Sequence, residues 1–267
     1  MTPLAPGLRR IVAARVRTAL TYRQNVLLLQ LIVILNIFIL SRLWTTLFEG
    51  RETIDGMTLH AFLVYLTVVN LQSWVFTDFT VNEYIYRRVR TGEIVFDLIR
   101  PAGFVPQLLA HMAGSHLFMG LSVVATLPVV MVVGTVDTPA SASALALYVP
   151  ALLLGYVIAL LLALLLSLVA FWTVETSGFT VLYRLINQFF AGTMLPVSLF
   201  PEPLRILAGL LPFQSTGYVP AALYVGRLEG AEALRALAVQ GLWVLLLTLA
   251  TVTVWHRARR RLSVQGG

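Results

Sequence analysis

The stretch LYVPALLLGYVIALLLALLLSLVAFW, residues 147–172, decides the class of this protein, because it runs for 26 residues without a charged side chain. A helix needs about 20 predominantly apolar residues to cross the hydrocarbon core of a bilayer. Further stretches of this kind lie at about 26–48, 57–80, 105–133, 179–200 and 234–256. The sequence therefore predicts an all-α integral membrane protein with six transmembrane helices.

The composition of the 267 residues agrees with this class. Hydrophobic side chains make up 58% of the chain and charged ones only 12%, whereas soluble domains carry about 25% charged residues. A soluble protein this apolar would lack the polar surface that keeps it in water. A disordered chain is excluded for the same reason.

The basic residues are 19 arginines, and the chain contains neither lysine nor cysteine. A phosphate-binding loop needs a lysine, so we expect no ATPase site in this chain, and no catalytic residue, cofactor or metal. The net charge of +7 could indicate a nucleic-acid partner. However, the arginines flank the apolar stretches, where they orient a membrane protein, and no nucleic acid is expected.

The distribution of the arginines predicts the orientation in the membrane. With a cytoplasmic N-terminus, 14 of the 19 arginines are cytoplasmic, four are external, and Arg42 lies in the outer part of the first span. The cytoplasmic set is Arg9, Arg10, Arg15, Arg17, Arg23, Arg87, Arg88, Arg90, Arg100, Arg184, Arg257, Arg259, Arg260 and Arg261. The opposite orientation inverts this ratio, so we expect both termini in the cytoplasm.

Two segments flank the six-span domain, which covers residues 26–256. Within residues 1–25, apolar side chains recur at helical spacing over 8–23 and arginines take the remaining face. This pattern predicts an amphipathic helix on the cytoplasmic membrane surface, and a plain positively charged flank is the alternative. Residues 257–267 predict a basic cytoplasmic tail.

Two regions between the spans are too apolar to be ordinary loops. The cytoplasmic segment NEYIYRRVRTGEIVFDLIRPAG, residues 82–103, mixes apolar side chains with charges of both signs. This mixture predicts a structured element that binds a partner. The external stretch 200–233 is interrupted by four prolines and four glycines. It predicts one or two short helices that dip into the outer leaflet, as irregular backbone at that depth must be buried or line a cavity.

Signatures of a membrane enzyme are absent from the sequence. The histidines His60, His111, His116 and His256 do not form a His-Glu-x-x-His zinc motif. The aspartates are spread along the chain without a near pair. An integral membrane enzyme acting on a lipid or peptide stays open as an alternative class, and so does a channel or scaffold protein.

Three short motifs resemble the permease subunits of ABC-2 type transporters, and specifically a bacterial branch of that family. The first is Thr91-Gly92-Glu93-Ile94 with Asp97-Leu98-Ile99-Arg100-Pro101. The second is Gly192 with Pro196 and Phe200-Pro201. The third is Leu211-Pro212-Phe213 with Tyr218-Val219-Pro220 and Tyr224-Val225-Gly226. The likeness extends from the N-terminal surface helix to the last span.

This resemblance implies a dimer of permeases, identical or paralogous, that works with two ABC ATPase subunits in a bacterial cytoplasmic membrane. ATP and Mg²⁺ are then bound by the ATPase. A cytoplasmic coupling helix between spans two and three docks on the ATPase, and short re-entrant helices precede span six. The implied function is efflux of a hydrophobic or amphipathic substrate such as a drug, an antibiotic or a lipid.

We assign the coupling segment to residues 84–100. The candidate apolar anchors are Ile85, Val89, Ile94 and Phe96. The candidate charged contacts at the rim are Arg87, Arg88, Arg90, Glu93, Asp97 and Arg100. For Arg87 and Arg88, contact with lipid headgroups is an equal alternative.

Two further sets of candidate residues follow from the same organisation. The outer re-entrant gate would contain Pro196, Phe200, Pro201, Pro212, Phe213, Tyr218 and Pro220. Polar residues in the spans could line a substrate path, or they could form hydrogen bonds between helices. For any single residue we put the hydrogen-bonding interpretation first. The path candidates are Asn36, Asn70, Gln72, Asn187 and Gln188.

Overall fold

The computed structural model describes residues 4–21, 23–76, 80–100, 103–133, 135–173 and 177–265. Five helices in these ranges are long and apolar enough to cross a membrane. They are α2 (Arg23–Leu47), α3 (Leu59–Phe76), α6 (Phe104–Val133), α7 (Ala142–Leu168) and α11 (Gly230–Gln265). The predicted all-α membrane class is therefore confirmed.

Shorter elements connect and flank these helices. At one end of the bundle lie α1 (Leu4–Thr21), α4 (Thr80–Arg90) and α5 (Ile94–Leu98), and a 3-10 turn η1 (Val169–Phe171) extends α7. Between α7 and α11 the order is α8 (Ser177–Phe190), η2 (Val197–Leu199), α9 (Glu202–Gly209), η3 (Phe213–Ser215) and α10 (Tyr218–Tyr224). A hairpin of β1 (Thr53–Ile54) and β2 (Met57–Thr58) joins α2 to α3.

The tight turn of this hairpin follows from its sequence. Asp55 and Gly56 form a two-residue loop in which both have positive φ, 55° and 74°. Asp-Gly is the usual choice for a turn that needs this conformation twice, because glycine pays no steric penalty there. Thr53 consequently pairs with Thr58, and Ile54 with Met57.

The prediction of a fifth span at 179–200 is wrong in its extent. The helix α8 has only 14 residues and ends at Phe190. Gly192 then adopts a positive φ of 79°, and the next α-helix, α9, begins only at Glu202. Six spans are reached within the described residues only if α9 and the segment Phe213–Tyr224, which are bent by 74°, are counted as one.

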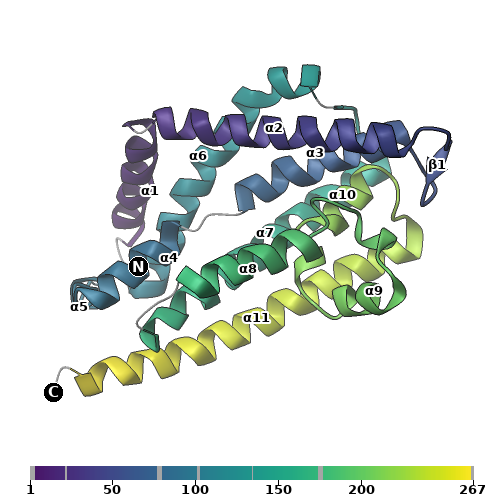
Figure 1. Cartoon of the computed structure of the whole chain (residues 1–267). Coiled ribbons are helices and arrows are strands. Elements are labelled where there is room, and N and C mark those ends of the chain that lie inside the picture. Colours follow the sequence, from purple (N-terminus) through teal and green to yellow (C-terminus); the bar gives the residue numbers. More distant parts are fainter. Residues whose placement is uncertain are drawn as a thin grey trace.

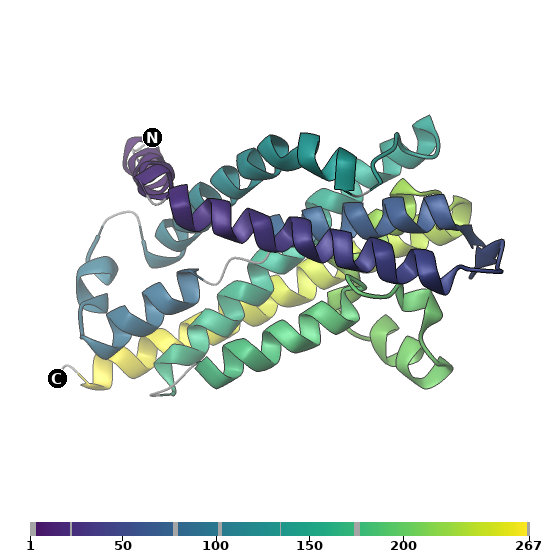
Figure 2. The same cartoon turned by 45° about the horizontal axis from the view of Figure 1, so that its top comes forward.

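The first and last helices bring the two described chain ends to the same end of the bundle (Figure 1). We call this the terminal end; it also carries α4 and α5. The hairpin and α9 lie at the opposite end, which we call the hairpin end. The helix α1 turns away from α2 and lies against the first part of α6 (Figure 2).

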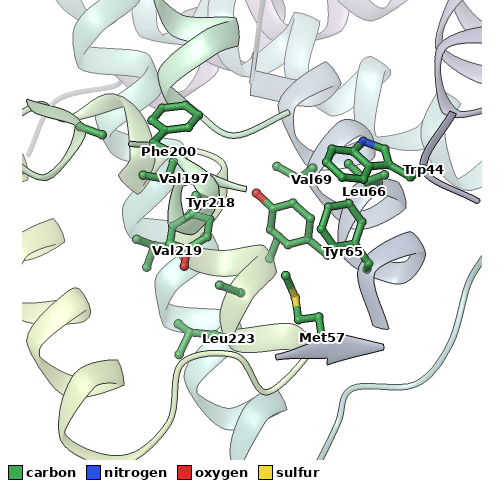
Figure 3. Close-up of a cluster of buried hydrophobic side chains, with 14 of the residues drawn as sticks. Trp44, Met57, Tyr65, Leu66, Val69, Val197, Phe200, Tyr218, Val219 and Leu223 are labelled. Atoms are coloured by element: carbon green, nitrogen blue, oxygen red, sulfur yellow. The ribbon is translucent and has the colours of Figure 1, made fainter. Parts of the chain in front are cut away.

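Two large apolar clusters of described residues pack the two ends of the bundle. The larger lies toward the hairpin end and is rich in aromatic rings (Figure 3). Ring centroids of Trp44 and Phe62 are 4.3 Å apart, and those of Tyr65 and Tyr218 are 6.1 Å apart. The smaller cluster lies at the terminal end, where Phe104 stacks on Trp255 with centroids 4.9 Å apart.

After α8 the chain is no longer helical, and side chains of the long helices donate hydrogen bonds to its backbone carbonyls. Tyr65 donates its hydroxyl to the carbonyl of Gly192 at 2.8 Å. Asn70 donates to the carbonyl of Thr193 at 2.9 Å, and the Trp44 indole donates to that of Met194 at 3.2 Å. These carbonyls therefore have partners although the chain turns inside the protein.

The second interruption, between α9 and α10, is held in the same way by two glutamines. Gln72 donates its amide to the carbonyl of Gly217 at 2.5 Å. Gln240 donates to the carbonyls of Ser215 at 2.8 Å and Ala151 at 3.0 Å. A Cβ on Gly217 would collide with the carbonyl oxygen of Ala191, so glycine is required where the two interruptions meet.

We predict that Gln240→Leu destabilises the fold by about 1–3 kcal/mol, because it removes the donor to the buried Ser215 carbonyl. Gln72→Leu should cost less, because the Gly217 carbonyl still accepts from the Ala221 amide. Thermal unfolding of the purified chain measures this. Gln30→Leu is the matched control: Gln30 donates to the carbonyl of Ser122, which also accepts from the Thr126 hydroxyl. Equal losses for all three variants would contradict this interpretation.

Candidate functional site

The corner between α4 and α5 is set by a glycine. The α4 helix ends at Arg90, and Gly92 then takes a positive φ of 74°. The amide of Thr91 still bonds to the carbonyl of Arg87 at 2.9 Å, while the amide of Gly92 bonds to that of Val89 at 3.3 Å. The chain reverses within this turn and begins α5 after Glu93.

A buried carboxylate holds this corner together. Asp97 is 1% exposed. It accepts a hydrogen bond from the Tyr84 hydroxyl at 3.0 Å and lies 3.5 Å from Nε of Arg88 and 3.6 Å from Nη1 of Arg100. Two guanidinium groups and a hydroxyl donor therefore surround this buried carboxylate.

The environment of Tyr84 keeps it as a hydrogen-bond donor. Burial raises the pKa of the Tyr84 phenol, and the nearby Asp97 charge raises it further. Both effects disfavour the phenolate. The hydroxyl is therefore protonated at neutral pH and continues to donate to the carboxylate.

The same corner is fastened to α6. Gln107 donates its amide to the backbone carbonyl of Asp97 at 2.9 Å and accepts from Nη1 of Arg100 at 3.2 Å. The five-residue helix α5 is thus bonded to α4 on one side and to a spanning helix on the other. Any displacement of α5 will be passed to both.

The predicted anchors divide into an inward and an outward set. Ile85 and Ile94 are buried in the apolar cluster at the terminal end, and Val89 packs against it. The prediction that Ile85 and Ile94 contact another subunit is therefore wrong, because both side chains are buried within this chain. Phe96 is 61% exposed and is therefore available for contact with another subunit.

The charged candidates divide in a similar way. Arg87, Arg90, Glu93 and Arg100 are exposed, and Arg88 is partly buried between Glu93 and Asp97. Asp97 was expected as a rim contact; its burial makes it part of the internal structure instead.

Two exposed residues of α5 and its end were missed by the sequence analysis. Val95 is 54% and Ile99 72% exposed, and both border Phe96 on the outer side of the short helix. Their apolar character was visible in the sequence. The side on which they emerge depends on the turn at Gly92 and on the burial of Ile94, which spacing alone does not give.

The seven outer-gate candidates gather around the two interruptions. Phe200 stacks on Phe189 with centroids 4.9 Å apart, and Phe213 lies 6.1 Å from Tyr183. Of the seven, Pro201 is exposed. The buried members are Pro196, Phe200, Pro212, Tyr218 and Pro220, with Phe213 half-buried. In this structure they form a packed cap.

The path candidates have different roles. Asn70 and Gln72 use their amide donors to hold the cap, so they fit the helix-bonding interpretation. Asn36 on α2 and Asn187 and Gln188 on α8 are half-buried and remain candidates for a path. Tyr65, Trp44 and Gln240, which also hold the cap, were missed; polar groups within apolar spans were the available signal.

We predict that Asp97→Asn loosens the α4–α5 corner, because Arg88 and Arg100 then face each other without a buried counter-charge. Removing one member of a buried ion pair costs about 3–5 kcal/mol. Hydrogen–deuterium exchange over residues 91–99 should become faster in this variant. Glu93→Gln removes an exposed partner of Arg88, worth at most about 1 kcal/mol, and should leave that exchange nearly unchanged.

Comparison with known proteins identifies the family of this chain. The profile described as "ABC-2 family transporter protein" matches residues 30–266. Searches of curated proteins and of solved structures gave no match. The matched region includes most of α2, all of α3, α6, α7 and α11, the α4–α5 corner and the cap. The chain therefore belongs to the ABC-2 transporter family and is a membrane permease of an ABC transporter.

Proposed function

We propose that the chain is the permease subunit of an ATP-driven exporter, and that a separate ABC ATPase, which binds ATP and Mg²⁺, docks on α5. The observation that carries this proposal is an exposed apolar group at the terminal end, formed by Val95, Phe96 and Ile99. We call these three residues the docking surface.

The surroundings of the docking surface favour a protein partner over lipid. Arg90, Glu93 and Arg100 lie close to it in sequence and are exposed. An apolar centre with a charged rim is the usual anatomy of a protein–protein contact. Moreover, a five-residue helix is far too short to cross a bilayer.

The attachment of α5 supports a coupling role. ATP-driven closure of the ATPase pair has to move the permease helices without a covalent link. Asp97 joins α5 to α4 through Arg88 and Tyr84, while Gln107 joins it to α6. A push on the docking surface would therefore reach a spanning helix directly.

The arginine distribution supports a cytoplasmic terminal end. Thirteen of the 14 arginines expected on the cytoplasmic side belong to segments at or next to this end, and Arg184 lies midway along α8. Both described chain ends are at the terminal end. We accordingly propose a bacterial cytoplasmic membrane, with α1 on the inner surface and the cap facing outward as a re-entrant gate.

A second permease, identical or paralogous, would complete the transporter. The helix α8 has no buried residue within this chain, and Val181, Leu182 and Leu185 are among its exposed side chains. We propose that α8 faces the second permease, with Asn187 and Gln188 near a path for a hydrophobic or amphipathic substrate between the two copies. Transport would then run outward by alternate opening toward the two sides.

We predict that the double variant Phe96→Ala/Ile99→Ala lowers the affinity for the ATPase at least ten-fold, since it truncates the centre of the docking surface. Co-purification of the ATPase and stimulation of its activity measure this. Leu210→Ala, an equally exposed apolar truncation at the hairpin end, is the control. Retention of full ATPase binding by the double variant would refute docking at α5.

The absence of cysteine in the chain permits a direct test of the second permease. Leu185→Cys on α8 should give disulfide-linked dimers in oxidised membranes, because such a bond requires Cα atoms within about 7 Å of each other. A disulfide-linked dimer of two copies of this chain indicates identical subunits, because a paralogous permease could form the bond only through a cysteine of its own. Val124→Cys on the exposed side of α6 should stay monomeric; a reversed pattern would remove α8 from the dimer contact.

A further inference from the structure

A basic pocket lies at the terminal end where α1, α4 and α6 meet. Its volume is about 330 Å³, which is roughly eleven times the share of one water molecule in the liquid. The lining residues are Ile11, Ala14, Thr18, Tyr84, Arg87, Arg88, Arg100 and His111. The pocket is distinct from the docking surface, whose residues do not line it.

The lining carries a positive charge that the fold neutralises only in part. Among the described residues that line the pocket, three are arginines and none is acidic. Asp97, which lies behind this lining, pairs with Arg88 and Arg100 but not with Arg87. Glu93 also pairs with Arg88, at 3.5 Å, so two carboxylates stand beside three guanidinium groups and the pocket keeps a net positive charge.

The pocket is also pre-organised. The Tyr84 ring lies between two neighbours: its centroid is 4.8 Å from that of His111 and 5.1 Å from Cζ of Arg88. This contact and the ion pair between Nε of Arg88 and Asp97, at 3.5 Å, restrain the Arg88 guanidinium. A guanidinium held in one orientation loses little entropy when it binds a phosphate with two parallel hydrogen bonds.

We propose that this pocket binds the phosphate group of an anionic ligand through Arg87, Arg88 and Arg100. Basic pockets between membrane helices on the cytoplasmic side suit lipid headgroups, and α1 brings an amphipathic surface to the same place. A free phosphate compound offers the same chemistry, so the test separates the two sources. The binding itself does not rest on the docking role proposed for α5.

Native mass spectrometry of the full-length chain in detergent tests the proposal, with dioleoylphosphatidylglycerol as anionic probe and dioleoylphosphatidylcholine as zwitterionic reference. Inorganic pyrophosphate is the water-soluble probe, and its binding is measured as a shift in the temperature of thermal unfolding. Arg87→Gln removes a pocket charge that does not pair with Asp97. Arg90→Gln removes a charge three residues away that bonds to the Tyr86 hydroxyl and does not line the pocket.

A third variant, Ala14→Phe, fills the pocket from α1 without changing any charge. We expect the anionic lipid to bind in preference to the zwitterionic one, with an affinity about five-fold weaker in Arg87→Gln, similarly weakened in Ala14→Phe, and unchanged in Arg90→Gln. The same pattern obtained with pyrophosphate alone supports the phosphate site and assigns it to a soluble ligand.

The proposal is overturned if Arg87→Gln and Arg90→Gln weaken binding equally, since the arginines then act only as a diffuse surface charge. It is also overturned if neither probe binds, or if Ala14→Phe has no effect while the unliganded variants unfold at the temperature of the parent chain. Docking of the ATPase, measured on the same variants, shows separately whether the proposed function holds.

Discussion

Backbone carbonyls that leave a helix inside an apolar environment must find donors, and the rest of the structure is arranged around this requirement. The chain is interrupted after α8 and again before α10, and of the carbonyls bonded by side chains there, that of Gly217 also accepts from a backbone amide, Ala221, at 3.4 Å. Tyr65, Asn70 and Gln72 on α3 donate into the interruptions, and Gln240 does so from α11. The polar residues of these spans are consequently committed to structure, and the aromatic cluster packs around the bonds they make.

The two ends of the bundle are held by different forces. The cap uses neutral hydrogen bonds between buried groups, which have no alternative partner in an apolar environment. The α4–α5 corner depends on Asp97 and the guanidinium groups of Arg88 and Arg100, and those arginines remain open to the basic pocket. A charged ligand or subunit can compete for such ion pairs. Of the cap and the α4–α5 corner, the corner is therefore the one whose bonds a charged ligand could replace.

Length and hydropathy were sufficient to predict the long helices, because their lipid-compatible surfaces are a property of the sequence. Three features could not be read in that way. The apolar run 179–200 looked like a span, but the helix ends at Phe190 and Gly192 then takes a positive φ. Ile94 and Phe96 are equally apolar, yet one is buried and the other exposed, because the turn at Gly92 sets which side of α5 meets the core. Asp97 resembled a surface charge, and only the convergence of α4, α5 and α6 shows that it is buried.

The helix α8 makes few stabilising contacts within this chain. A 14-residue helix is marginal on its own even with a favourable sequence, and no side chain of α8 is buried within this chain. Its large exposed apolar residues can be covered by lipid, but lipid offers neither shape complementarity nor partners for the amides of Asn187 and Gln188. A second permease offers both. The exposure of α8 in one copy is therefore the structural feature that favours the proposed second permease.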